Sequence, residues 1–100
     1  MYWNYPDKER LVQAFVLAEN THLIRDLLKD LLTKKEIDSL ANRLHAACLL
    51  YDGAPYSQIE QMTQLSSKTI SGISRKLIDK RGGFQQIIKK FNPHGRRYFD

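Results

Sequence analysis

Apolar residues recur along the chain at the spacings of three and four that are typical of amphipathic helices. Between Leu11 and Ala18, however, seven of eight residues are apolar, which exceeds the single stripe of a surface helix. We expect a helix with Asp7 as its N-cap, directly after Pro6, that is buried on more than one side. A monomer of 100 residues can hardly surround such a helix, whereas a partner subunit can.

Two further helices carry clear start signals. Asn20 or Thr21 caps the first of them, which shows a leucine-rich stripe. Thr33 and Glu36 then have the spacing of a capping box, in which each side chain satisfies a free backbone N–H group of the other residue. The helix behind this box runs for about 18–20 residues, or ~30 Å, until Gly53 stops it. It is long enough to form the spine of the domain.

A shorter helix and a turn follow. Ser57 and Glu60 have the spacing of a second capping box, which predicts a helix of about two turns with Ile59 and Met62 facing inward. Gln64 then occupies a turn position where glycine is usual. We therefore expect either a left-handed Gln64, at a cost of ~1 kcal/mol, or a turn that is one residue longer.

Two more helices complete the pattern. The first is capped by Ser66 or Ser67 and ends at the glycine pair 82–83, and the second is a short helix over residues 84–91. We expect a break over residues 92–95 and a frayed tail over residues 96–100. Five positions of the longer helix are expected to face inward: Ile70, Ile73, Ser74, Leu77 and Ile78.

This pattern predicts an all-α fold of about six helices, because the sequence shows neither strand alternation nor an internal repeat. We expect a single helical domain over residues 1–100. Within it, residues 8–52 would form the dimerisation helices, residues 56–81 a helix-turn-helix, and residues 84–100 a C-terminal helix and tail.

The helix-turn-helix prediction rests on the order of a short helix, a tight turn and a second helix, which enters the DNA major groove by its N-terminal half. Five side chains fall where this motif needs inward residues: Ile59, Thr63, Leu65, Ile70 and Ile73. On the outward side, Lys68 is suited to contact a guanine and Thr69 a thymine methyl group. Four cations further along are better placed for phosphates: Arg75, Lys76, Lys80 and Arg81.

Charge is distributed unevenly along the chain. The formal net charge of +5 divides into −2 over residues 1–65 and +7 over residues 66–100. A basic C-terminal segment can simply be solvated, or it can form a surface that meets a polyanion. The predicted recognition helix lies in the basic part, which favours DNA as the partner.

Several other classes of protein are disfavoured. Cys48 is the only cysteine, so it can form neither an internal disulfide nor a cysteine-based zinc site. The sequence shows no signal peptide and no apolar run near the ~20 residues of a membrane span, and we expect a cytoplasmic protein. His45 and Cys48 are the only close pair of catalytic residue types, and Cys48 lies on an apolar stripe. We expect no enzyme activity, no catalytic residue and no metal site.

The segment over residues 32–53 is similar to the middle of the Trp repressor superfamily. The motifs YSQIE, residues 56–60, and SSKTIS, residues 66–71, resemble its helix-turn-helix and are most similar to the YerC/YecD-type branch. The similarity covers about residues 8–80. It implies an intertwined homodimer that binds palindromic operator DNA and regulates transcription, as a repressor. It also implies that Ser57 and Gln58 contact the DNA backbone while Ser67, Lys68, Thr69 and Ser71 face the bases.

In the tryptophan-responsive members of this superfamily, two arginines hold the corepressor. Arg43 matches the first arginine, but Gly72 stands at the position of the second. Glycine supplies neither charge nor a stacking surface, so we expect no cofactor and no response to tryptophan. Arg43 can serve either in effector binding or in a structural ion pair.

A second function is compatible with the same pattern. A helical dimeric protein-interaction module could use its basic C-terminal surface to bind an acidic partner. Such a module would show no salt-dependent affinity for duplex DNA, which separates the two hypotheses.

Overall fold

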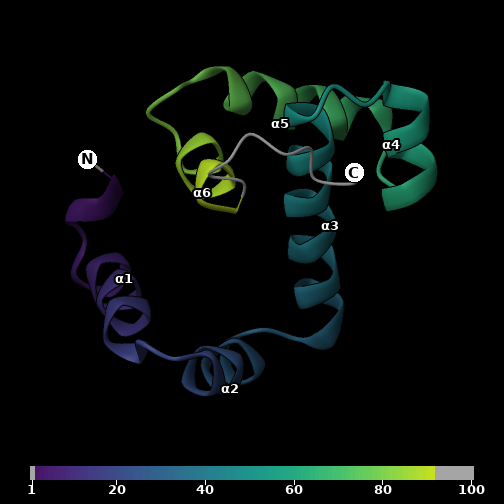
Figure 1. The fold of residues 1–100 in the computed structure, drawn as a ribbon. Helices are drawn as coiled ribbons and strands as arrows, with labels where there is room; N and C mark the ends of the chain where they lie inside the picture. Colours follow the sequence, from purple (N-terminus) through teal and green to yellow (C-terminus); the bar gives the residue numbers. More distant parts are fainter. Residues whose placement is uncertain (1, 92–100) are drawn as a thin grey trace. The chain divides into compact units, whose positions relative to one another are not determined.

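The computed structural model describes residues 2–91 of the chain. In this range the chain forms a short 3-10 helix, six α-helices and no strand (Figure 1). The elements are η1 (Tyr2–Asn4), α1 (Pro6–Ala18), α2 (Thr21–Leu31), α3 (Lys34–Tyr51), α4 (Tyr56–Thr63), α5 (Ser67–Ile78) and α6 (Gly83–Phe91). The predicted all-α fold of six helices is confirmed. The predicted break at 92–95 and tail at 96–100 lie outside the described residues.

The chain divides into two compact units, Met1–Ile37 and Asp38–Asp100, and the boundary falls in the first turn of α3. In the first unit, the expectation that Asp7 caps α1 is wrong. The N-cap is Tyr5, and Pro6 is the first helical residue. Proline suits this position because its φ is already helical and its missing N–H group would have no partner there. Asp7 instead accepts a 2.7 Å hydrogen bond from Lys8 Nζ, which holds the pKa of its carboxyl below the usual value.

Helices α2 and α3 begin at the capping residues that the sequence predicts. Asn20 rather than Thr21 caps α2, because its Oδ1 accepts a 2.9 Å hydrogen bond from the Leu23 N–H group. At the start of α3, Thr33 N donates to Glu36 Oε1 at 2.9 Å and Glu36 N donates to Thr33 Oγ1 at 3.1 Å. The capping box is therefore confirmed, and these bonds to Thr33 lower the pKa of Glu36.

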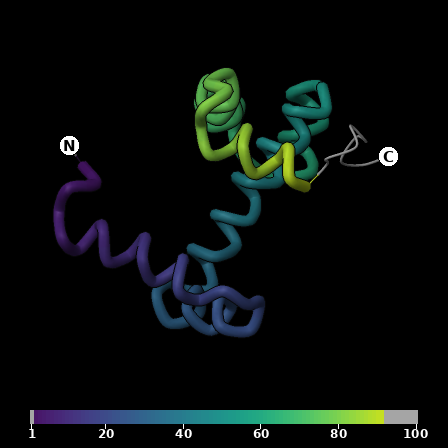
Figure 2. Tube along the Cα trace, turned by 60° about the vertical axis from the view of Figure 1, so that its left-hand side comes forward, coloured from purple at the N-terminus to yellow at the C-terminus, as the bar shows by residue number. Residues whose placement is uncertain are grey.

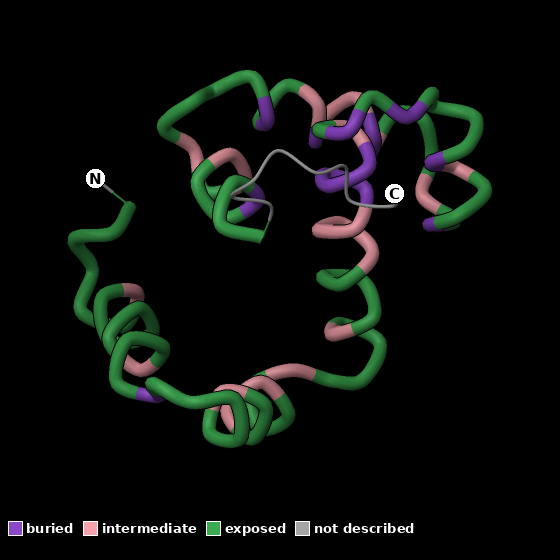
Figure 3. The backbone as a smooth tube through the Cα atoms, viewed as in Figure 1, coloured by how far each residue is buried: buried purple, intermediate pink, exposed green. Residues whose placement is uncertain are grey.

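The first unit has almost no buried interior. Among its described residues only Ala18 is buried, and most of α1 and α2 is exposed (Figure 3). The exposed apolar side chains include Leu11, Val12, Phe15, Val16, Leu17, Leu23 and Leu31. The predicted burial of α1 is thus not achieved by the chain alone. A unit of fewer than ~40 residues with so little core needs additional support, for which oligomerisation is a common source.

The second unit has a well-defined core. Buried side chains come from the C-terminal half of α3 and from α4, α5 and α6 (Figure 3). Figure 1 and Figure 2 agree that α4 and α5 lie beside each other near the C-terminal end of α3. The core consists of Ala46, Ala47, Cys48, Leu49, Ala54, Ile59, Ile70, Ile73, Leu77 and Ile88.

Helix α3 ends at a glycine, as the sequence predicts. Gly53 has a φ of 84°, a value that side chains rarely adopt. Its N–H group donates to the Leu50 carbonyl at 3.0 Å, and the next N–H group, of Ala54, donates to the Leu49 carbonyl at 3.0 Å. These two bonds are the Schellman pattern, which satisfies the last carbonyl groups of a helix.

The start of α4 differs from the sequence prediction. Pro55 is its N-cap, and no side chain forms a capping hydrogen bond there, so the expected box between Ser57 and Glu60 is wrong. The Pro55 carbonyl accepts from the N–H groups of Gln58 and Ile59 at 3.1 and 3.2 Å, which places Ser57 inside the first turn. Met62 is also not inward but 45% exposed, because the inward stripe runs from Ile59 to Thr63.

The end of α5 also differs from the sequence prediction. The helix stops at Ile78 rather than at the glycine pair, and Gly83 is the first residue of α6. Of the five positions expected to face inward, Ile70, Ile73 and Leu77 are buried, Ser74 is half-buried and Ile78 is 76% exposed. Successive helical residues are ~100° apart around the axis, so Ile78 falls outside the stripe that the three buried residues define.

Candidate nucleic-acid interface

A tight turn joins α4 to α5. Gln64 is left-handed, with φ 62° and ψ 15°, so the first of the two alternatives expected for this turn is the one found. Its backbone N–H donates to the Glu60 carbonyl and its side-chain Nε2 to the Gln61 carbonyl, both at 2.9 Å. Thr63 Oγ1 donates to the Ile59 carbonyl at 2.7 Å and accepts from Leu65 N at 3.3 Å. These local bonds stabilise the turn.

The inward residues of the two helices are placed as the motif requires. Ile59, Thr63, Ile70 and Ile73 are buried, and Leu65 is half-buried against the core. Because side chains from both helices and from the turn pack into one core, the crossing of α4 and α5 is fixed by packing rather than by the turn alone.

The first turn of α5 is capped by Ser66. Its Oγ accepts from the Thr69 N–H group at 3.2 Å and donates to Thr69 Oγ1 at 3.1 Å. The Thr69 hydroxyl therefore takes part in the cap. The methyl group of Thr69 is the part of the side chain that is suited to an apolar contact with a thymine methyl group. Ser67 and Lys68 lie in the same turn and are exposed.

The structure brings the predicted base-contacting residues together on the first two turns of α5. Ser67, Ser71 and Arg75 recur every four residues, and Lys68 is three residues before Ser71, which places all four on one side of the helix. Ser67, Lys68 and Arg75 are exposed and Ser71 is half-buried. Thr69 and Lys76, seven residues apart, lie along the edge of this face. Ser57 and Gln58 are exposed on a different element, in the first turn of α4.

The charge of this region is strongly positive. Residues 61–91 contain seven Lys and Arg residues and a single acidic residue, Asp79. Across residues 2–91 the one ion pair is that of Lys8 with Asp7, so no described carboxylate neutralises the cations of α5 and α6. A polyanion can therefore approach these cations without displacing an ion pair between described residues.

The residues expected to bear on effector binding lie in the second unit. Arg43 is half-buried on α3 and forms no ion pair within the described part of the chain. An open hollow of about 930 Å³ lies nearby in the same unit, and its lining does not include Arg43. The lining residues are Leu44, Gly72, Arg75, Lys76, Asp79, Gly82, Gly83, Phe84 and Ile87.

The Arg75 guanidinium lies close to Gly72. Its Nη2 atom is 3.9 Å from the position that a Cβ atom of Gly72 would occupy. The spacing of three residues, which places both on one side of the helix, is the signal that could have indicated this contact. The space beside Gly72 is thus bordered by a guanidinium from the next turn.

Cys48 belongs to the core rather than to a reactive site. The side chain is buried, and its burial, followed by the nearby negative charge of Asp52, raises the pKa of the thiol. No group of three or more His, Cys, Asp or Glu side chains within residues 2–91 could hold a metal ion. No helix in the described part of the chain is long and apolar enough to cross a membrane.

The short α4, the left-handed turn and the capped α5 define a helix-turn-helix. A model of the Trp repressor protein family matches residues 7–92, and the chain belongs to this family. The family is one of helix-turn-helix DNA-binding regulators rather than enzymes. Comparisons with curated proteins and with solved structures gave no significant match.

Proposed function

We propose that this protein is a sequence-specific transcriptional repressor of the YerC/YecD type that binds palindromic operator DNA as a homodimer. The observation that carries the proposal is the polar and basic face of α5, which continues from Ser67 to Arg75 while the opposite face is buried in the core. A helix held in this way can enter the major groove by its N-terminal half. This role fits the cytoplasmic location that the sequence predicts.

Two groups of side chains have different roles in this proposal. Residues near the start of α5 read the base edges, because short hydroxyl side chains and a long cation there can reach the groove floor: Ser67, Lys68, Thr69 and Ser71. Residues outside the groove bind phosphates and set the register of the protein on the duplex: Ser57, Gln58, Arg75 and Lys76.

Replacing Lys68 by alanine is expected to lower affinity for the selected operator by roughly tenfold to a hundredfold, which corresponds to ~1–3 kcal/mol for one base contact. The variant should also lose its preference at one operator position. The operator is first selected from a random duplex library, and affinities are then measured by fluorescence anisotropy. The spacing of the selected half-sites reports the dimer geometry.

Arg75→Ala is the matched control, since Arg75 lies on the same face of α5 and carries the same charge. It is expected to weaken selected and random duplexes alike and to reduce the salt slope by roughly one unit for the phosphate that the side chain no longer binds. Equal reductions in affinity for both duplexes in Lys68→Ala would contradict base reading by Lys68. No salt-dependent duplex binding at all would favour the protein-interaction module instead.

We also propose that operator binding needs no cofactor and is independent of tryptophan. A buried carboxylate requires a charged partner such as Arg43, and the indole ring requires a second guanidinium stacked on its face. Gly72 cannot supply that guanidinium. Without a cation–π interaction of ~1–2 kcal/mol, binding is weaker by roughly five- to thirtyfold.

Calorimetry of the purified protein with L-tryptophan is expected to show no binding in the micromolar range, and the operator affinity should not change when tryptophan is added. Because the Arg75 guanidinium borders Gly72, Arg75→Ala is titrated in parallel. Clear micromolar binding by the unmodified protein would refute the proposal. Its disappearance in Arg75→Ala would then identify Arg75 as the second guanidinium.

A further inference from the structure

The turn between α5 and α6 is held by hydrogen bonds on both sides. Asp79 is the C-cap of α5, and its Oδ1 atom accepts a 2.9 Å hydrogen bond from the Arg81 N–H group. The Gly82 N–H group donates to the Asp79 carbonyl at 3.0 Å. From α6, Gln86 Nε2 donates to the Arg81 carbonyl at 2.7 Å. The backbone of this four-residue turn is thus fixed to the end of α5 and to the start of α6.

Gly82 allows the turn to close tightly. A Cβ atom at Gly82 would lie 3.1 Å from the Asp79 carbonyl oxygen and 3.5 Å from the Lys76 carbonyl oxygen. The first distance is shorter than an ordinary contact, so a larger residue would require the Asp79 carbonyl to move by a few tenths of an ångström. A hydrogen bond between α6 and α5, from Gln85 Nε2 to the Leu77 carbonyl at 2.8 Å, supports the same arrangement.

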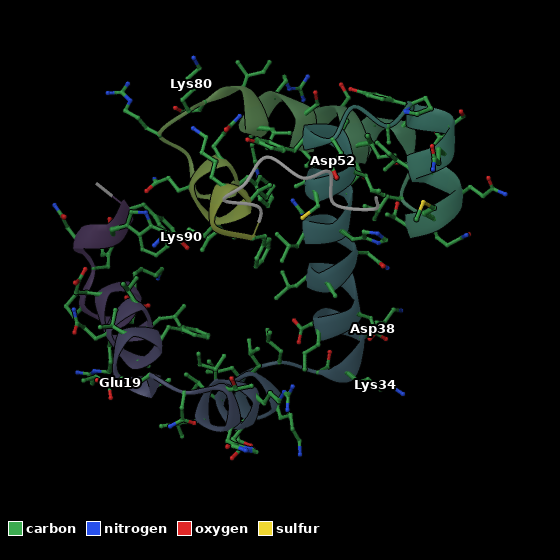
Figure 4. All side chains as sticks on the ribbon, viewed as in Figure 1. Glu19, Lys34, Asp38, Asp52, Lys80 and Lys90 are labelled. Carbon is green, nitrogen blue, oxygen red and sulfur yellow. The ribbon has the colours of Figure 1, made fainter. Side chains whose placement is uncertain are left out.

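Two cations stand at the tip of this turn. Lys80 and Arg81 are both exposed, and neither forms an ion pair with a described residue. Figure 4 shows Lys80 at the turn, above α6 in this view, whereas Lys90 lies below on α6 itself. Asp79 accepts the Arg81 N–H group and keeps its negative charge. The turn therefore presents two cations that form no ion pair with a described residue, and its net charge remains positive.

The length of α5 determines where this tip would lie on DNA. The helix has 12 residues, and at ~1.5 Å per residue it extends for ~18 Å. The major groove of B-DNA, which α5 enters by its N-terminal half, is only ~8.5 Å deep. If the first turn of α5 reads the bases, its C-terminal end lies beyond the groove that it enters. Side chains attached directly after that end are then near the backbone that flanks the recognised bases.

We propose that the turn at residues 79–82 is a second DNA contact, in which Lys80 and Arg81 bind phosphates outside the base pairs that α5 reads. This inference rests on the proposed function and extends its binding surface beyond the helix-turn-helix. It makes the affinity depend on the length of the duplex as well as on its sequence. The cations of the last turn of α6, Lys89 and Lys90, take no part in this contact.

The test uses the whole chain of 100 residues and two series of duplexes, one limited to the selected operator and one extended by about half a helical turn, ~5 base pairs, at each end. The unmodified protein is expected to bind the extended duplex more tightly. In the double variant Lys80→Ala/Arg81→Ala this increase in affinity should disappear. Two phosphate contacts account for roughly a tenfold change in affinity between about 50 and 200 mM salt. In the double variant, the slope of log affinity against log salt concentration should therefore be shallower by roughly two units.

The matched control is Lys89→Ala/Lys90→Ala, which removes the same charge from exposed positions of α6 and should keep the length dependence. Alanine preserves the Arg81 N–H and carbonyl groups that hold the turn, and urea unfolding of both variants verifies that stability is unchanged. If the unmodified protein binds no duplex, the proposed function fails and this inference with it. If it binds but extension does not raise the affinity, or both variants abolish the increase equally, only the contact by the turn is refuted.

Discussion

Phe15→Asp is expected to convert the protein from a dimer into a monomer and to lower its operator affinity by roughly 100- to 10,000-fold. Phe15 lies on α1 with Leu11 and Val12, and all three side chains are exposed in the single chain. In the proposed homodimer a partner covers this surface, so a carboxylate there would be buried without a partner charge. A monomer reaches one half-site only and lacks the advantage of binding two linked sites, which is ~10²–10⁴.

The measurement is the mass by light scattering at micromolar concentration, followed by operator binding. The unmodified protein should show twice the chain mass of 11.7 kDa, with an interface above ~2,000 Å². Gln13→Asp is the control, because Gln13 is an exposed polar residue on the opposite side of α1 and receives the same new charge. A monomeric mass for the unmodified protein would refute the homodimer. Equal effects of both substitutions would show that Phe15 is not at its interface.

The second large effect is expected from Ile70→Ala, which should lower the free energy of unfolding by ~2–5 kcal/mol. Ile70 is completely buried between the helices of the second unit. Its truncation removes apolar contacts and leaves a cavity, since the neighbouring side chains relax only in part. Domains of this kind have total stabilities of ~5–15 kcal/mol, so the decrease is a large share of the whole.

Urea unfolding followed by circular dichroism measures this change at a fixed protein concentration, because dimer stability depends on concentration. Ile78→Ala is the comparison in the same helix. Ile78 is 76% exposed in the chain, and its truncation should change the unfolding free energy by no more than ~0.5 kcal/mol. Similar decreases for the two variants would mean that Ile78 is buried, in the core or by a partner subunit.

Features that depend on short-range interactions could be predicted from the order of residues. Helix starts at Asn20, Thr33 and Ser66 could be predicted because a capping side chain and the N–H group that it accepts from lie within three residues of each other. The inward residues of the helix-turn-helix could be predicted for a similar reason, since helical periodicity shows which positions share a face. The basic character of the region after residue 65 is a property of composition alone.

Other features depend on contacts between helices, because the local sequence is compatible with more than one conformation. Gln64 could be left-handed or part of a longer turn, and packing of α4 against α5 selects the strained but shorter connection. The end of α5 at Ile78 depends on bonds from Gln85 and Gln86 of the next helix, which no local pattern indicates. The exposure of α1 likewise depends on contacts between segments that are distant in the sequence. Apolar composition shows that a surface needs cover, but only the arrangement of the chain shows that its own residues do not provide that cover.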